Sequence, residues 1–134
     1  MMVKSAGKQS PTIVCLCGST KFKDEFEAMT ARETLLGKIV LTVGFFHHVQ
    51  MVPITADQKA DLDKLHLKKI ELADEVLIIN PDGYIGKSTR SELAYAIVWN
   101  KTIHWLKAKE GESYMENNSQ LLGKLGAKHL GYGD

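Results

Sequence analysis

The densest group of chemically useful residues is the stretch 83–92, which reads Gly-Tyr-Ile-Gly-Lys-Ser-Thr-Arg-Ser-Glu. Its two glycines permit sharp backbone turns close to a ligand. The hydroxyls at the start of a predicted helix indicate a cup for an anion, to which the guanidinium of Arg90 would add a fork of donors. Glu92 would lie beside that cup, on the first turn of the helix. The residues expected to contact a ligand here are Gly83, Tyr84, Gly86, Ser88, Thr89 and Arg90.

Two roles fit the pattern around Glu92. The sequence Thr89-Arg90-Ser91-Glu92 matches the Ser/Thr-x-x-Glu capping box, in which the glutamate bonds the N–H of the capping residue. The same carboxylate, kept ionised by the positive end of the helix, could instead attack an electrophilic carbon. The residues alone leave both roles open.

A second anion-binding signal is Gly18-Ser19-Thr20, which leads from an apolar run directly into a predicted helix. Free backbone N–H groups at such a junction suit a phosphate or a sugar hydroxyl. The sequence lacks the glycine spacing of both the Walker motif and the Gly-x-Gly-x-x-Gly dinucleotide motif. A plain tight turn, with Ser19 or Thr20 as the N-cap of the helix, is the alternative.

Aromatic and titratable residues on other segments complete the predicted site. Phe46 and His48 follow the second predicted strand, and Asp82 follows the third. Because the carboxyl ends of parallel strands meet at one edge of a sheet, these residues should lie near the two anion-binding stretches. His66 lies on the apolar face of a predicted helix, where it is either a ligand contact or a buried structural histidine.

Four apolar runs must position these groups, and helical periodicity separates them. The runs predict strands over residues 12–17, 38–43, 75–80 and 101–106. Apolar residues at helical spacing predict helices over residues 22–36, 57–73 and 89–100. This alternation predicts an α/β fold whose parallel sheet of four to five strands is covered on both faces by helices.

The chain has 134 residues and a formal net charge of +1. This length predicts a single domain, over residues 12–134, behind a disordered tail at residues 1–11. The tail lacks the apolar core of a signal peptide. A nearly neutral chain disfavours nucleic acid polymers, and no apolar run in the sequence is long enough to span a membrane. A small molecule is therefore the expected partner.

Both cysteines, Cys15 and Cys17, alternate along the first predicted strand and therefore share one of its faces. Neighbours this close rarely form a disulfide, so a reduced, cytoplasmic setting is expected. They would supply only two metal ligands, because His47 and His48 are far away in sequence. We expect them to be small core residues, and we expect no metal or cofactor site.

Three short motifs in a fixed order make the chain recognisable. They are Cys17-Gly18-Ser19-Thr20, Leu72-Ala73-Asp74-Glu75-Val76, and Gly86 with Ser91-Glu92-Leu93-Ala94-Tyr95-Ala96. In this order, across residues 12–106, they resemble the nucleoside 2-deoxyribosyltransferase-like family, which includes the 2′-deoxynucleoside 5′-monophosphate N-hydrolases. The resemblance implies a flavodoxin/Rossmann-like three-layer sandwich and a homo-oligomer whose subunits complete each other's sites.

The resemblance also implies an enzyme that cleaves the N-glycosidic bond of a (deoxy)nucleoside or nucleoside 5′-monophosphate, by hydrolysis or base transfer. In such a reaction a carboxylate stabilises or bonds an oxocarbenium-like carbon. Glu92 would be this nucleophile, and Asp82 would handle the base. His66 stands where many members carry Asp. Because of that replacement, a non-catalytic nucleotide-binding or sensor module is the alternative function.

Overall fold

The computed structural model describes residues 10–44, 51–112 and 114–115. Within them, strands alternate with helices as the sequence predicts. The elements are β1 (Ile13–Gly18), α1 (Lys23–Leu35), β2 (Ile39–Leu41), α3 (Ala56–Leu72), β3 (Glu75–Ile79), α4 (Lys87–Val98) and β4 (Thr102–Trp105). The predicted ligand residues Phe46 and His48, together with residues 1–9 of the predicted tail, lie outside the described residues.

The four described strands form one parallel sheet in the order β2-β1-β3-β4, which confirms the predicted α/β fold of flavodoxin/Rossmann-like type. The central strands pair from Val14 opposite Glu75 to Gly18 opposite Ile79. The edge strand β2 is shorter than predicted, because it pairs only with β1 and only over residues 39–41. The strand order reverses between β1 and β3, and open parallel sheets bind ligands beyond the carboxyl ends of the strands at such a point.

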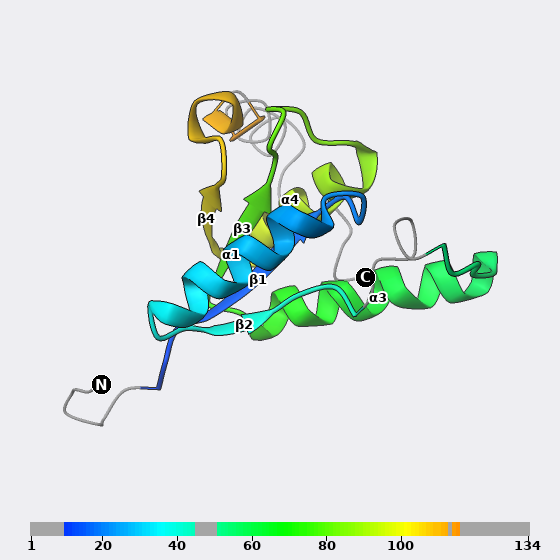
Figure 1. The fold of residues 1–134 in the computed structure, drawn as a ribbon, viewed down its shortest axis with the longest axis horizontal. Coiled ribbons are helices and arrows are strands. Elements are labelled where there is room, and N and C mark those ends of the chain that lie inside the picture. The colour runs from blue at the N-terminus through cyan, green and yellow to red at the C-terminus, as the bar shows by residue number, and fades with distance from the viewer. Residues whose placement is uncertain (1–9, 45–50, 113, 116–134) are drawn as a thin grey trace.

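Helices cover both faces of this sheet, which gives the molecule three layers (Figure 1). On one face α1 packs against β1, and Phe26 and Leu16 belong to the same buried cluster. On the opposite face α3 and α4 pack against β1 and β3, and Leu93 belongs to a cluster with Cys15 and Cys17. Alternate residues of β1 therefore serve opposite layers, and both cysteines are fully buried, as the sequence predicts.

Charged side chains tie α1 to the amino ends of β2 and β3. Lys38 Nζ donates to Glu33 Oε1 at 2.8 Å and to Glu75 Oε1 at 2.7 Å. Glu33 is only 4% exposed, and Arg32 Nε donates to its other oxygen at 3.0 Å. Burial alone would raise the pKa of Glu33, but the two cations outweigh burial and lower it. This charged network therefore stabilises the edge of the sheet that carries the amino ends of the strands.

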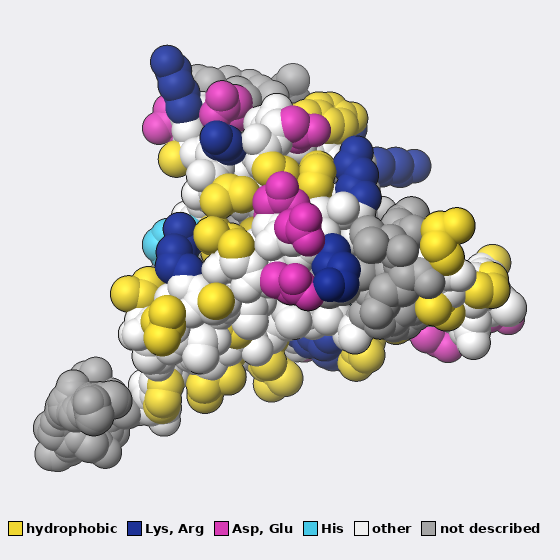
Figure 2. Space-filling model, viewed as in Figure 1, with side chains coloured by type: hydrophobic (Ala, Val, Ile, Leu, Met, Phe, Trp, Pro, Cys, Tyr) yellow, Lys and Arg dark blue, Asp and Glu magenta, His cyan; other side chains and the backbone are white. Residues whose placement is uncertain are grey.

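Exposed hydrophobic side chains gather where α1 ends and β2 begins (Figure 2). They are Leu35, Leu36 and Ile39. Leu36 continues the helical spacing of the buried Phe26, but α1 ends at Leu35, and Leu36 is 65% exposed.

Among the described residues, no helix is both long enough and apolar enough to cross a membrane.

Gly18, the last residue of β1, permits the close approach of β1 and β3. A Cβ atom there would lie 2.9 Å from Ile79 Cβ and 3.0 Å from the Ile79 carbonyl oxygen. We expect Gly18→Ala to destabilise the protein by about 1–3 kcal/mol, because the backbone must shift to admit the methyl group. Gly44→Ala is the matched control, since nothing lies within 4 Å of a Cβ atom at Gly44. Urea denaturation measures both, and equal stabilities would show that the two strands can separate without cost.

Candidate functional site

A cavity of about 350 Å³ lies at the carboxyl ends of β1 and β2, beside α3 and the first turns of α4. This volume is within the range of small-molecule binding pockets. Segments that are far apart in the sequence converge here, because the parallel sheet places the carboxyl ends of its strands at one edge. The predicted site residues that line the cavity are Gly18, Ser19, Thr20, His66, Gly86, Ser88, Thr89 and Glu92.

The sequence predicts Glu92 on the first turn of α4, but the structure places it on the second turn. The helix begins at Lys87 with Gly86 as its N-cap, so Thr89 is a buried residue inside the helix. The capping-box alternative for Glu92 is therefore excluded, because that motif requires the glutamate at the third helical position. Residues three and four apart share a helix face, which places Glu92 next to Ser88 and Thr89 on the cavity wall.

The surroundings of Glu92 oppose its ionisation. Burial raises the pKa of its carboxyl group to about 7, and the charges of Cys15 and Asp63 add to the rise. The charges of His66 and Lys59 act in the opposite direction. Burial thus outweighs the positive end of the helix, which was expected to keep this carboxylate ionised. A carboxyl group with such a pKa can attack when ionised and can donate a proton when neutral.

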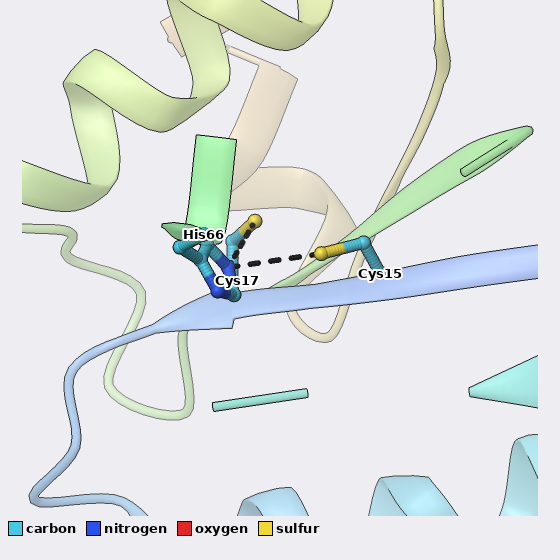
Figure 3. A group of neighbouring side chains, drawn as sticks. All are labelled: Cys15, Cys17 and His66. Atoms are coloured by element: carbon cyan, nitrogen blue, oxygen red, sulfur yellow. Dashed lines mark hydrogen bonds between the residues drawn. The ribbon is translucent and has the colours of Figure 1, made fainter. Parts of the chain in front are cut away.

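His66, on α3, contacts both thiols of β1 (Figure 3). Its Nε2 atom lies 3.4 Å from Cys17 Sγ and 3.7 Å from Cys15 Sγ. The contact arises because both cysteines point to the face of β1 that α3 covers. His66 is only 6% exposed and also lines the cavity, so its side chain is buried and faces the cavity at the same time.

The thiols and the imidazole differ sharply in their affinity for protons. The hydrogen bond with Cys17 lowers the pKa of Cys15 to about 6, against the effect of burial, and His66 adds to the lowering. The same hydrogen bond, together with burial, raises the pKa of Cys17 well above its usual range. Burial alone would lower the pKa of His66, but its contact with Cys15 and the charge of Glu92 outweigh burial and raise it.

The amino end of α4 lies at the cavity without a side-chain cap. Its N-cap is Gly86, which has no side chain, whereas α3 begins with a complete capping box between Thr55 and Gln58. Lys87 and Ser88 on the first turn are exposed and line the cavity. A Cβ atom on Gly86 would meet nothing within 4 Å, so the space beside this terminus is open. Backbone N–H groups, a hydroxyl and an ammonium group together suit an anion.

Four predicted site residues do not line the cavity: Asp82, Gly83, Tyr84 and Arg90. Asp82 Oδ1 accepts a hydrogen bond from the backbone N–H of Tyr84 at 3.2 Å, and so it stabilises the turn before α4. Gly83 has a φ of 85°, in the left-handed region that favours glycine, and a Cβ atom there would lie 2.9 Å from Glu110 Cγ. Arg90 is exposed on α4. Asp82 and Gly83 therefore belong to the turn before α4 and not to the cavity wall.

The sequence analysis missed the part of α3 that lines the cavity. Besides His66, this helix contributes Lys59, Leu62, Asp63, Leu65 and Lys69. Lys59 Nζ and Asp63 Oδ1 form an ion pair at 2.8 Å, and Lys69 Nζ donates to the carbonyl of Thr42 at 2.7 Å. Helical spacing backwards from His66 leads to Asp63 and Lys59, and this signal could have identified them.

No family model matches the chain, and the search of curated proteins found no match to it either. The resemblance to the nucleoside 2-deoxyribosyltransferase-like family therefore rests on short motifs alone. Of those motifs, Gly18-Ser19-Thr20 and Glu92 lie on the cavity wall. The function of the chain has to be argued from the cavity and the chemistry of its side chains.

Proposed function

We propose that the protein cleaves the N-glycosidic bond of a (deoxy)nucleoside or nucleoside 5′-monophosphate, with Glu92 as the nucleophile. The observation that carries this proposal is the environment of Glu92. Its carboxyl group lines a cavity large enough for a small-molecule ligand, has a pKa raised by burial to about 7, and follows an uncapped helix terminus. Perturbed carboxyl groups in such cavities are typical of catalytic sites.

The reaction needs a carboxylate beneath the anomeric carbon of the sugar. The ionised form of Glu92 would attack that carbon as the C–N bond breaks, through an oxocarbenium-like state. The electron pair of the broken bond leaves with the base, which then takes up a proton. Attack by water would complete a hydrolysis, and attack by a second base would complete a transfer. The charge of His66 lowers the pKa of Glu92 and so favours the attacking form.

The amino end of α4 would hold the 5′-phosphate of a monophosphate. Lys87 and Ser88 lie about one turn before Glu92, on the same cavity. The N–H groups of this first turn carry the positive end of the helix dipole, which attracts an anion. Lys59, by contrast, is held in an ion pair with Asp63, and Lys69 donates to the carbonyl of Thr42. Lys87 is therefore the cation we assign to the phosphate.

Lys87→Ala should weaken the binding of a nucleoside 5′-monophosphate by roughly tenfold or more, because a charge-assisted contact is lost. Binding of the matching nucleoside should hardly change. Arg90→Ala is the matched control, since it removes a positive charge from the same helix at a residue outside the cavity wall. Calorimetric titration of both ligands measures the effect. A loss confined to Arg90→Ala would place the phosphate on the residue that the sequence analysis favoured.

A substrate panel tests the proposed activity directly. The protein would be incubated with nucleosides and 5′-monophosphates of each base, with and without a free acceptor base, and released or exchanged base would be detected by chromatography. Release without an acceptor indicates a hydrolase, and exchange indicates a transferase. If no member of the panel loses its base, the proposed cleavage is wrong.

The second candidate function is a nucleotide-binding module without turnover. The observation in its favour is the pKa of Glu92, because a carboxyl group with a pKa raised to about 7 is partly neutral at neutral pH and attacks poorly in that form. Such a module would bind members of the panel, and ligand binding would raise its thermal midpoint. A raised midpoint with no released or exchanged base would favour this function.

A further inference from the structure

We propose that Cys15, Cys17 and His66 bind a Zn²⁺ ion, with a water molecule from the adjacent cavity as the fourth ligand. The sequence shows two thiols and predicts no metal, because the third ligand lies 49 residues beyond Cys17. Folding places the imidazole against both thiols, and one ligand atom from each of the three residues lies within 4.8 Å of the others (Figure 3). Metal binding here does not depend on the proposed glycosidic cleavage.

The distances between the ligand atoms suit a tetrahedral zinc ion. Zinc–sulfur bonds of about 2.3 Å and zinc–nitrogen bonds of about 2.0 Å, at tetrahedral angles, separate sulfur from nitrogen by roughly 3.5 Å. The Nε2 atom of His66 lies 3.4 Å from Cys17 Sγ and 3.7 Å from Cys15 Sγ. An ion between these atoms would therefore need little movement of the side chains.

The kinds of ligand atom favour zinc over harder ions. Thiolate and imidazole bind Zn²⁺ well, whereas Mg²⁺ and Ca²⁺ take oxygen ligands. Cys15 and Cys17 are fully buried and form no disulfide, so both sulfur atoms are free to bind. Two thiolates would neutralise the charge of the ion.

The cavity supplies a route of entry for the ion and for the water molecule that completes its coordination. Cys15 and Cys17 lie on β1 behind the cavity, but His66 and Glu92 line it. Binding would release the thiol protons, and any proton on Nε2 of the imidazole, to water. The three protein ligands therefore need no rearrangement of the backbone.

Titration of the untagged, reduced and chelator-washed chain with Co²⁺ tests this site. Co²⁺ substitutes for Zn²⁺ in tetrahedral sites and gives a thiolate charge-transfer band together with intense visible bands. Because Cys15 and Cys17 are the only cysteines in the sequence, a thiolate band assigns ligation to them. We expect saturation at one Co²⁺ ion per chain and complete displacement by Zn²⁺. The absence of a thiolate band at millimolar Co²⁺ would overturn the proposal.

Single variants locate the ligands. Cys17→Ser and His66→Gln should each weaken Co²⁺ binding about 100-fold or more. His104→Gln is the matched control, because His104 is half exposed on β4 and should not affect binding. Unchanged affinity in His66→Gln would overturn the site.

The wild-type chain gives a second readout, which stays valid if a variant with a replaced core residue fails to fold. An ion that binds only the folded chain raises its thermal midpoint. We expect Zn²⁺ to raise the midpoint, and we expect Mg²⁺ at the same concentration to leave it unchanged, because the ligand set contains two sulfur atoms and one nitrogen. An equal response to both ions, or no response to Zn²⁺, would contradict the proposed site.

Discussion

Glu92→Gln should lower the rate of base release by at least about a thousandfold and leave ligand affinity nearly unchanged. Glutamine keeps the size and hydrogen-bonding capacity of glutamate, but it has no carboxylate to attack the anomeric carbon. Asp63→Asn is the matched control, because Asp63 lines the same cavity in an ion pair with Lys59, and this variant should keep most of the turnover. Turnover within a fewfold of wild type in Glu92→Gln would remove Glu92 from the mechanism.

Glu92→Gln should also stabilise the protein above neutral pH. Burial raises the pKa of Glu92 from its ordinary value of 4.5 to about 7. The folded protein therefore binds this proton more tightly than the unfolded chain does. The resulting stability is complete below about pH 4.5 and is lost as the pH rises through about 7. Glutamine carries no charge, so the variant would keep that stability.

Thermal unfolding of wild type and Glu92→Gln across this pH range measures the effect. The variant should be more stable by about 1–3 kcal/mol at slightly alkaline pH, and the two proteins should unfold alike in acid. A difference in stability that does not change with pH would show that folding does not raise the pKa of Glu92. Together, lost turnover and gained stability would mark a group that is retained for its chemistry.

Lys38→Met should lower the free energy of unfolding by about 2–4 kcal/mol. Methionine keeps the apolar stem, but its introduction leaves the buried Glu33 and the neighbouring Glu75 without the cation that they share. Lys23→Met is the matched control, because its partner Glu27 is 60% exposed and an exposed ion pair contributes little to stability. Denaturant unfolding measures both variants. Equal losses would show that the charged network is worth no more than a surface ion pair.

The loss in Lys38→Met should depend on pH in a defined direction. Burial opposes both shifts, yet the ion pairs lower the pKa of Glu33 and raise the pKa of Lys38. The contribution of Glu33 is present above its ordinary pKa of 4.5 and is lost as the pH falls. The contribution of Lys38 is present below its ordinary pKa of 10.5 and is lost as the pH rises. The gap between wild type and variant should be widest between these two values.

The order of strands and helices was predictable because a parallel sheet buried on both faces leaves continuous apolar runs in the sequence. Residues 14–17 and 76–79 are buried without interruption. The start of α4 was predicted two residues late, since Thr89 and Glu92 match a capping box, whereas the N-cap Gly86 has no side chain to signal the helix start. The edge strand β2 ends where its pairing with β1 ends, at Leu41. The apolar run that predicts this strand continues to residue 43, so the sequence alone does not show where the pairing stops.

The site was predictable where chemistry and chain order coincide. Gly18-Ser19-Thr20 lies at the end of β1, and Glu92 lies on the helix that follows β3, so the parallel sheet places both on the cavity. The contact of His66 with the two thiols joins residues 49 and 51 positions apart, and no local pattern encodes such a contact. Asp82 was placed in the site because it follows the third predicted strand and because the resemblance implies an acidic residue there, but its side chain accepts a hydrogen bond within the turn.

The position of β1 between β2 and β3 has a consequence for the time course of folding. The nascent chain emerges with β1 first, but the partner β3 is complete only after Ile79, and the contact of Ile13 with Asp74 spans 61 residues. Such non-local pairing is slow. Until it forms, the thiols of Cys15 and Cys17 are open to metal ions and oxidants in the surrounding water. The chemical state of these thiols in a cell would thus depend on how fast the chain folds as well as on what it binds afterwards.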